Sequence, residues 1–175
     1  MNLEIRRADV SDAATIALLG RITFAESFGH LFQEHAEDLR TYLDRTFAVG
    51  KIRGSLEQPC NAYWLGSVDG LPVSYAKLKY PSAPSATPVA DRSDISQLQK
   101  IYVLREFSGR GIGQPLLHEV LRHADTLQAA AVWLDVLEEN IRAVQFYERH
   151  GFRALGNDTY TIGAQTFAFL LMTKP

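Results

Sequence analysis

Three glycines occupy five positions of the segment SGRGIG, at Gly109, Gly111 and Gly113. The segment follows an alternating apolar run and precedes a run with helical spacing, so it predicts a turn between a strand and a helix. The free N–H groups of such a turn converge with those of the first helical turn, and the helix dipole favours negative charge there. Glycine lets phosphate oxygens approach the backbone, and Arg110 adds a positive charge. The pattern predicts an anion site, with a purely structural turn as the alternative.

Two common phosphate-binding motifs do not fit this turn. A P-loop requires Gly-Lys-Ser or Gly-Lys-Thr after four intervening residues, and GRGIGQ lacks this ending. A dinucleotide-binding fold places its glycines after the first strand, whereas this turn lies past the middle of the chain. The anion site is therefore expected to belong to another class of protein.

A second pair of residues with chemical potential lies in NIRAVQFY, where Asn140 and Tyr147 are seven positions apart. In a helix this spacing puts both side chains on one face, roughly 10 Å apart at ~1.5 Å rise per residue. Both side chains could then face one groove. The alternatives are a plain helix cap for Asn140 and a core aromatic ring beside Phe146 and Phe152 for Tyr147.

The apolar spacing along the chain predicts the elements that position these segments. Strands are expected in residues 3–8, 62–80 (two strands joined at Asp69-Gly70), 95–104, 130–137 and 152–173 (two strands). Helices are expected in residues 9–28, 34–49, 113–129 and 140–151. Residues 81–94, rich in Pro, Ser and Ala, are expected to form an exposed loop. This order predicts a mixed sheet covered by helices.

The composition fits one domain spanning residues 1–175. The 18 basic and 20 acidic residues nearly cancel, which disfavours a nucleic-acid or anionic membrane partner. Cys60 is the only cysteine, so we expect no internal disulfide, and the five histidines show no metal spacing. The first residues lack the apolar core of a signal peptide, and no apolar run approaches the ~18 residues of a membrane helix. We therefore expect a cytoplasmic protein without a bound metal.

Several segments together resemble the Gcn5-related N-acetyltransferase (GNAT) family. The family signature is Gln or Arg, two residues, Gly, one residue, then Gly or Ala; residues 108–113 match both small positions, and Ser108 departs from the first. IRRADVSDAATIALL resembles the family's opening, KIYVLREF its fourth strand, and WLDVLEENIRAVQFYERHGF its fifth strand and following helix. The resemblance implies an α/β (α+β) fold, with a mixed, mostly antiparallel sheet of about seven strands and about four helices. It also implies that the sheet splays between the fourth and fifth strands around acetyl-coenzyme A.

By this resemblance the chain is an acetyl-coenzyme A dependent N-acetyltransferase that moves an acetyl group directly to the primary amine of a small molecule. The residues expected to bind the cofactor are Ile101, Tyr102, Val103, Ser108, Gly109, Arg110, Gly111, Ile112, Gly113, Gln114 and Asn140. Family members use the tyrosine at the position of Tyr147 as general acid to the departing thiolate. A backbone N–H near Tyr102 or Val103 would stabilise the oxyanion.

The general base is harder to place. The amine must lose a proton before it attacks, because an alkylammonium group has a pKa of about 10. Relatives often carry an acid on the fourth strand, where this chain has Gln97 and Gln99. Asp135 and Glu26 are the remaining candidates, and a structural acid is the alternative for each.

The nearest branch by resemblance is the bacterial spermine and spermidine acetyltransferases, on the segments TFAESFGHLF, KIYVL, WLDVLEEN and FYERHGF. A polyamine would favour an acidic recess, for which Glu26, Glu34, Glu37 and Asp38 are candidates; a solvated helix face is the alternative. Three other functions stay open: a protein N-terminal or lysine acetyltransferase, an antibiotic or toxin acetyltransferase, and a non-catalytic coenzyme A sensor. Family members are often dimers, so a homodimer is a further expectation.

Overall fold

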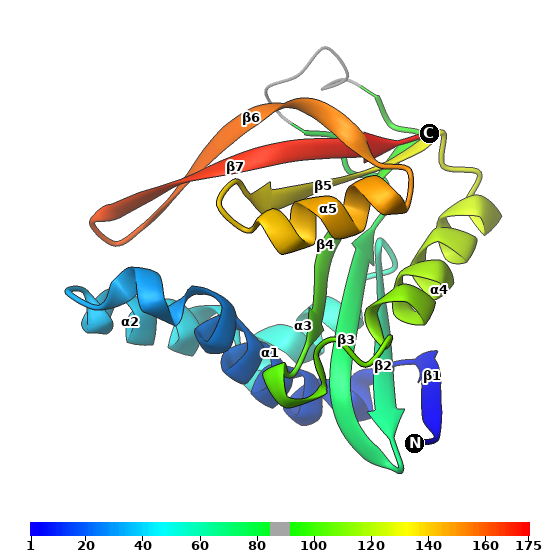
Figure 1. The fold of residues 1–175 in the computed structure, drawn as a ribbon. Coiled ribbons are helices and arrows are strands. Elements are labelled where there is room, and N and C mark those ends of the chain that lie inside the picture. Colours follow the sequence, from blue (N-terminus) through cyan, green and yellow to red (C-terminus); the bar gives the residue numbers. More distant parts are fainter. Residues whose placement is uncertain (85–91) are drawn as a thin grey trace.

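A seven-stranded sheet runs through the computed structural model, which describes residues 1–84 and 92–175 (Figure 1). The strands are β1 (Leu3–Arg7), β2 (Asn61–Val68), β3 (Leu71–Lys79), β4 (Ile95–Val103), β5 (Ala131–Leu137), β6 (Arg153–Ile162) and β7 (Gln165–Lys174). Their order in the sheet is β1-β2-β3-β4-β5-β7-β6, and β4 and β5 are parallel whereas the other neighbours are antiparallel. The mixed, mostly antiparallel sheet predicted from the sequence is confirmed.

The described residues form five α-helices, one more than predicted. The helices are α1 (Ala13–Phe28), α2 (Ala36–Thr46), α3 (Val49–Leu56), α4 (Gly113–Thr126) and α5 (Ile141–Arg149). The additional helix is α3, which carries Gly50 and Gly54 and so has weak intrinsic helix propensity. Its tertiary contacts hold it: Ile52 is buried, and the hydroxyl of Ser55 lies 2.8 Å from that of Tyr63 on β2.

The pairing between β4 and β5 ends after three residue pairs. Ile95 pairs with Ala131, and the last pair is Gln97 with Trp133, yet β4 continues to Val103 and β5 to Leu137. Figure 1 shows the two halves of the sheet, β1–β4 and β5–β7, diverging from this point. The expected splay between the fourth and fifth strands is therefore confirmed.

Two apolar clusters cover the two faces of the sheet. On one face the buried side chains of α4, such as Leu116 and Val120, pack with Trp64 and Leu98 of the sheet and with Tyr147 of α5. The other face carries a cluster in which α1 to α3 pack against β2 and β3; its buried members include Ile16, Phe24, Ile52, Tyr63 and Tyr75. The helices that cover the second face also form a wall of the cavity described below.

The tip of the β6–β7 hairpin is attached to α2. The N–H of Ala164 donates a hydrogen bond to Asp38 Oδ2 at 3.1 Å, and the rings of Phe32 and Phe167 lie 5.3 Å apart. Gly163, beside Ala164, has a φ of 58°, and a Cβ at this position would collide with the Asp38 carboxylate. Figure 1 shows the hairpin reaching across to α2. The close contact requires glycine at this turn.

Replacing Gly163 by Ala is expected to lower the thermal stability. The left-handed backbone costs an alanine about 1–2 kcal/mol, which corresponds to roughly 2–8 °C in Tm for a chain of this size. Gly54→Ala is the matched control, because nothing lies within 4 Å of a Cβ there and alanine favours a helix. Thermal denaturation of both variants measures the difference. A Gly163→Ala protein as stable as the wild type would show that the hairpin does not depend on this contact.

Candidate functional site

The predicted glycine turn connects β4 to α4, as the sequence indicated. Gly109 and Gly111 have φ values of 79° and 80°, in the left-handed region that favours glycine. The space in front of Gly111 is open, since no atom lies within 4 Å of an added Cβ, whereas a Cβ at Gly109 would approach Nη2 of Arg142 at 3.2 Å. Helix α4 begins at Gly113, and its first N–H groups have no partner within the helix. The turn therefore presents an accessible backbone surface suited to an anion.

A cavity of about 590 Å³, here called the groove, lies between this turn, β4, β5 and α5. Its lining includes all of the predicted cofactor residues except Arg110: Ile101, Tyr102, Val103, Ser108, Gly109, Gly111, Ile112, Gly113, Gln114 and Asn140. The guanidinium of Arg110 instead lies over the ring of Phe107, at 5.2 Å, and 3.8 Å from Glu106. The structure thus brings together residues that are far apart in the sequence.

The wall of the groove formed by β4 has free backbone groups. Beyond Gln97 the strand has no hydrogen-bonded partner on the β5 side, and in a strand every second residue points its N–H and C=O to that side. The register with β3 also shifts: Lys77 pairs with Lys100 and Leu78 with Leu98, so Gln99 has no partner. Such bulges redirect side chains beside functional sites. Gln99 and Lys100 consequently both line the groove.

Asn140 and Tyr147 both line the groove, as their spacing predicted. Asn140 also caps α5, because its Oδ1 accepts a hydrogen bond from the N–H of Ala143 at 3.1 Å. The ring of Tyr147 packs in the core, 5.6 Å from the ring of Phe152, and burial raises the pKa of its hydroxyl well above the usual value. No hydrogen bond joins this hydroxyl to the described residues. Each residue therefore combines its structural role with a place in the groove.

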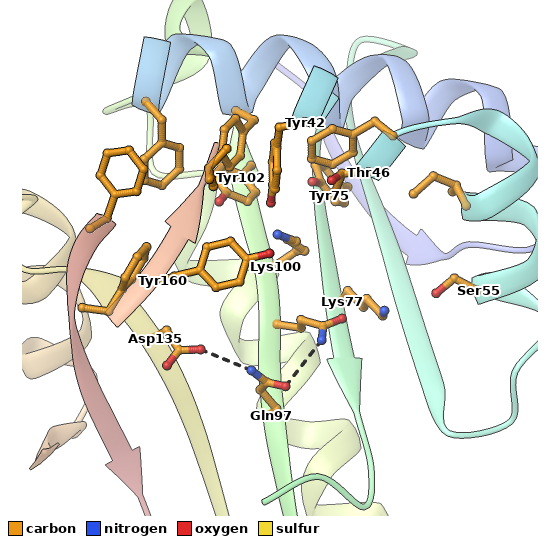
Figure 2. A pocket seen from close by; sticks show the side chains of 18 of the residues that line it. Tyr42, Thr46, Ser55, Tyr75, Lys77, Gln97, Lys100, Tyr102, Asp135 and Tyr160 are labelled. Carbon is orange, nitrogen blue, oxygen red and sulfur yellow. Dashed lines mark hydrogen bonds between the residues drawn. The ribbon is translucent and has the colours of Figure 1, made fainter. Parts of the chain in front are cut away.

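A second cavity, of about 500 Å³ and here called the pocket, opens beside the groove (Figure 2). Aromatic side chains from α1, α2 and the sheet form much of its wall: Phe24, Phe28, Phe32, Tyr42, Phe47, Tyr63, Tyr75, Tyr102, Tyr160, Phe167 and Phe169. Three lysines, Lys51, Lys77 and Lys100, and two acids, Asp135 and Asp158, also line it. The pocket is thus apolar for most of its wall and carries both signs of charge.

The groove and the pocket meet where β4 and β5 diverge. The residues that line both cavities are Phe28, Gln99, Lys100, Tyr102, Asp135 and Phe169. A molecule in the groove and another in the pocket could therefore come into contact at this junction. The splayed strands supply most of its polar side chains.

Asp135, on β5, lies at the junction with its carboxylate accessible to solvent in the cavities. Gln97 Nε2 donates a hydrogen bond to its Oδ2 at 3.3 Å, as Figure 2 shows. Partial burial, which removes water from the carboxylate, and the charge of Asp158 raise the pKa of Asp135 to about 6. The hydrogen bond from Gln97 and the charge of Lys100 act in the opposite direction. The carboxylate is thus poised to exchange a proton near neutral pH.

Glu26, the other acid considered as a base, lines neither cavity. Its Oε2 accepts a hydrogen bond from the N–H of Arg105 at 2.8 Å, and its carbonyl oxygen accepts one from the Arg105 guanidinium. These bonds tie the end of α1 to the segment after β4. The structure therefore gives Glu26 the structural role that was its alternative.

The acidic recess considered in the sequence is not formed by the proposed residues. None of Glu26, Glu34, Glu37 and Asp38 lines the groove or the pocket. Asp38 holds the β6–β7 hairpin, and Glu37 pairs with Arg40 at 2.7 Å. The solvated helix face that was the alternative holds for Glu37, whereas Asp38 has a structural role.

The three lysines of the pocket were not predicted from the sequence. Tyr63, Tyr75 and Lys77 belong to strands of the hairpin, and the period-two alternation in β3 puts Tyr75 and Lys77 on one face. The alternation in β3 is the sequence feature that could have placed Lys77 beside Tyr75 in the pocket. Lys100 could not be placed in this way, because the unpaired residue Gln99 changes the alternation in β4.

Among residues 1–84 and 92–175, no group of three or more His, Cys, Asp or Glu side chains could hold a metal ion. The same residues contain no helix long and apolar enough to cross a membrane.

Comparisons with known proteins agree with this arrangement. Residues 23–152 match the model of the acetyltransferase (GNAT) family. An uncharacterized N-acetyltransferase from the pepI 3′ region of Lactobacillus delbrueckii subsp. lactis is 24% identical over 172 residues, 98% of this chain and 96% of its own. An uncharacterized N-acetyltransferase of Mycobacterium tuberculosis is 31% identical over 128 residues, 73% of this chain and 76% of its own.

A shorter match joins this chain to a spermine/spermidine N(1)-acetyltransferase of Bacillus subtilis, 28% identical over 60 residues, 34% of this chain and 40% of that protein. Among solved structures, the PaiA N-acetyltransferase of Thermoplasma acidophilum in complex with coenzyme A superposes with a TM-score of 0.77. It is 17% identical, with 99% of each chain covered, and so supports the fold.

The carboxyl group of Asp135 is expected to titrate at about pH 6, which carbon NMR of the labelled carboxyl group measures directly. Replacing Lys100 by Met should raise this pKa further, because the positive charge of Lys100 favours the ionised carboxylate. Lys79→Met is the control, since Lys79 lines neither cavity. A titration near pH 4 in the wild type would contradict the environment described for Asp135.

Proposed function

The chain belongs to the acetyltransferase (GNAT) family, and we propose that it transfers an acetyl group from acetyl-coenzyme A to the primary amine of a small molecule. The observation that carries this proposal is the junction of the groove with the pocket. A donor in the groove and an acceptor in the pocket would meet there in one ternary complex. Direct transfer then requires no enzyme nucleophile, and Cys60 has no part in it.

The groove has the features that acetyl-coenzyme A requires. The open backbone at Gly111 and the first N–H groups of α4 suit the pyrophosphate, since both present donors without intervening side chains. The free edge of β4 can bond the amides of the pantetheine arm, and the amide N–H₂ group of Asn140 is a further donor, because its Oδ1 already caps α5. Ser108 stands where the family has Gln or Arg. Its side chain contributes less to pyrophosphate binding than the backbone N–H groups of the turn do.

The transfer requires a donor to the oxyanion, a proton donor to the departing sulfur and an acceptor for the proton of the amine. The amine nitrogen attacks the thioester carbon, and the carbonyl oxygen becomes an oxyanion that a β4 N–H near Tyr102 or Val103 can stabilise. The C–S bond then breaks and coenzyme A leaves as a thiolate. A tyrosine hydroxyl is protonated at neutral pH, so that of Tyr147 can donate to the departing sulfur.

The amine must also lose a proton, and we assign this proton to Asp135. Its pKa of about 6 leaves the carboxylate ionised at neutral pH and still more basic than an ordinary aspartate. The hydrogen bond from Gln97 orients the carboxylate at the junction. Glu26 is set aside because it lines neither cavity.

A polyamine acceptor has support in the short match to the Bacillus subtilis spermine/spermidine enzyme. The three lysines of the pocket oppose it, because they would repel a polycation. A non-catalytic coenzyme A sensor is disfavoured by the position of Tyr147 and Asp135, since a sensor needs neither a donor at the sulfur nor a base at the junction.

Replacing Tyr147 by Phe removes the hydroxyl and keeps the ring in the core. We expect acetyl-coenzyme A to bind almost as tightly as to the wild type, while kcat falls by about 10²–10⁴, the range of general acid catalysis. Calorimetry measures the binding, and thiol release measures the turnover. An unchanged kcat would remove Tyr147 from the chemistry.

Replacing Gly111 by Val tests the backbone cradle. A β-branched residue is strained at a φ of 80°, and its side chain would occupy the open space in front of the turn. We expect the Kd of acetyl-coenzyme A to rise by at least about tenfold, or ~1.4 kcal/mol. The Gly54→Ala variant, far from the groove lining, should bind normally. Wild-type affinity in a folded Gly111→Val protein would leave the glycines with a structural role alone.

A further inference from the structure

We propose that the acceptor is an amine that carries an anionic group, in the first instance a carboxylate, on an aromatic or other apolar body. The inference rests on the proposed function, and it concerns the lysines that line the pocket. The residues that carry it are Lys51, Lys77 and Lys100, which come from three different elements.

These lysines form a positive cluster without a close ion pair, although the charge of Asp135 acts on Lys100. In residues 1–84 and 92–175, no carboxylate lies within 4.0 Å of any of the three ammonium groups. The ammonium group of Lys77 lies 5.4 Å from the centre of the Tyr63 ring. Burial lowers the pKa of Lys77 and that of Lys100 to about 8, and the charge of Lys100 adds to the effect on Lys77. An anion bound among them would offset the free-energy cost of burying these positive charges.

Two acids, Asp135 and Asp158, also line the pocket. Asp135 lies on β5 at the junction, and Asp158 lies on β6. Figure 2 shows Asp135, Lys100 and Lys77 in that order across the pocket, on the successive strands β5, β4 and β3. The amine would bind at Asp135, and the anion would bind at the lysines that follow it across the pocket. The pocket therefore favours an acceptor that carries an amine and an anionic group at different positions.

Aromatic rings form the wall of the pocket beside this row of charged side chains. Phe24 lies with its ring 4.7 Å from that of Tyr42 and 6.1 Å from that of Phe47, and Tyr75 stacks on Tyr102 at 5.9 Å. An apolar body would bury its surface against these rings. The selection against spermidine and spermine comes from the three lysines, which would repel a second ammonium group.

A matched pair of acceptors tests the inference. 4-(Aminomethyl)benzoate and 4-methylbenzylamine have the same amine and ring, and only the first has a carboxylate. Thiol release from acetyl-coenzyme A gives kcat/KM for both compounds and for spermidine. The wild type should favour the carboxylate compound over its uncharged partner by at least tenfold, with spermidine the poorest of the three.

Variants identify the residues responsible for this preference. Lys77→Met should abolish most of it by lowering kcat/KM for the carboxylate compound alone, and Lys77→Arg should retain it. Lys79→Met, two residues along β3 and outside the pocket lining, should leave it unchanged. A wild type that prefers the uncharged amine or spermidine would overturn the inference, as would a preference that survives in both Lys77→Met and Lys51→Met.

Direct binding separates this inference from the proposed function. If no compound is acetylated, calorimetry with 4-(aminomethyl)benzoate and 4-methylbenzylamine still reports on the pocket. Tighter binding of the carboxylate compound to the wild type, lost in Lys77→Met, would support the inference while the proposed reaction fails. Equal binding of the two compounds would overturn the inference whether or not acetyl-coenzyme A itself binds.

Discussion

The end of the β4–β5 pairing at Gln97 and Trp133 is the constraint on which the site depends. A sheet that continued to pair would satisfy the backbone of β4 and leave no space between the strands. Divergence instead creates a free strand edge, and the glycine turn and α5 complete a groove along it. The same divergence opens the pocket on the other side, so donor and acceptor can approach one another from opposite directions.

The pocket depends in addition on elements far from the splay. The β6–β7 hairpin reaches α2 through the bond from Ala164 to Asp38, which helps to close the pocket on the side away from the groove. Helix α3 contributes Lys51 and Ser55 to its lining. These peripheral segments set the charge and shape seen by the acceptor, whereas the centre of the sheet sets the reaction. A family of enzymes can therefore keep one chemistry and change its substrate by altering the periphery.

The sequence predicted the central features well, because each has a local cause. The glycine turn before residue 113, the cap at Asn140 and the hairpin at Asp69-Gly70 follow from short-range chemistry, and the structure has all of them. The pocket was not predictable in the same way. Its three lysines come from α3, β3 and β4, and the register of β4 shifts beside Lys100. No local sequence pattern therefore indicates that the three charges lie in one pocket. The sequence pattern instead indicated an acidic recess near Glu37, and this helix surface lines neither cavity.

A crystal structure of the protein with coenzyme A would show whether the splayed strands hold the cofactor. We expect the pyrophosphate at the Gly109–Gly113 turn, the pantetheine arm along β4 beyond Gln97, and the thiol at the junction lined by Lys100, Tyr102 and Asp135. Coenzyme A bound elsewhere, or strands β4 and β5 paired along their whole length with the groove closed, would contradict this expectation.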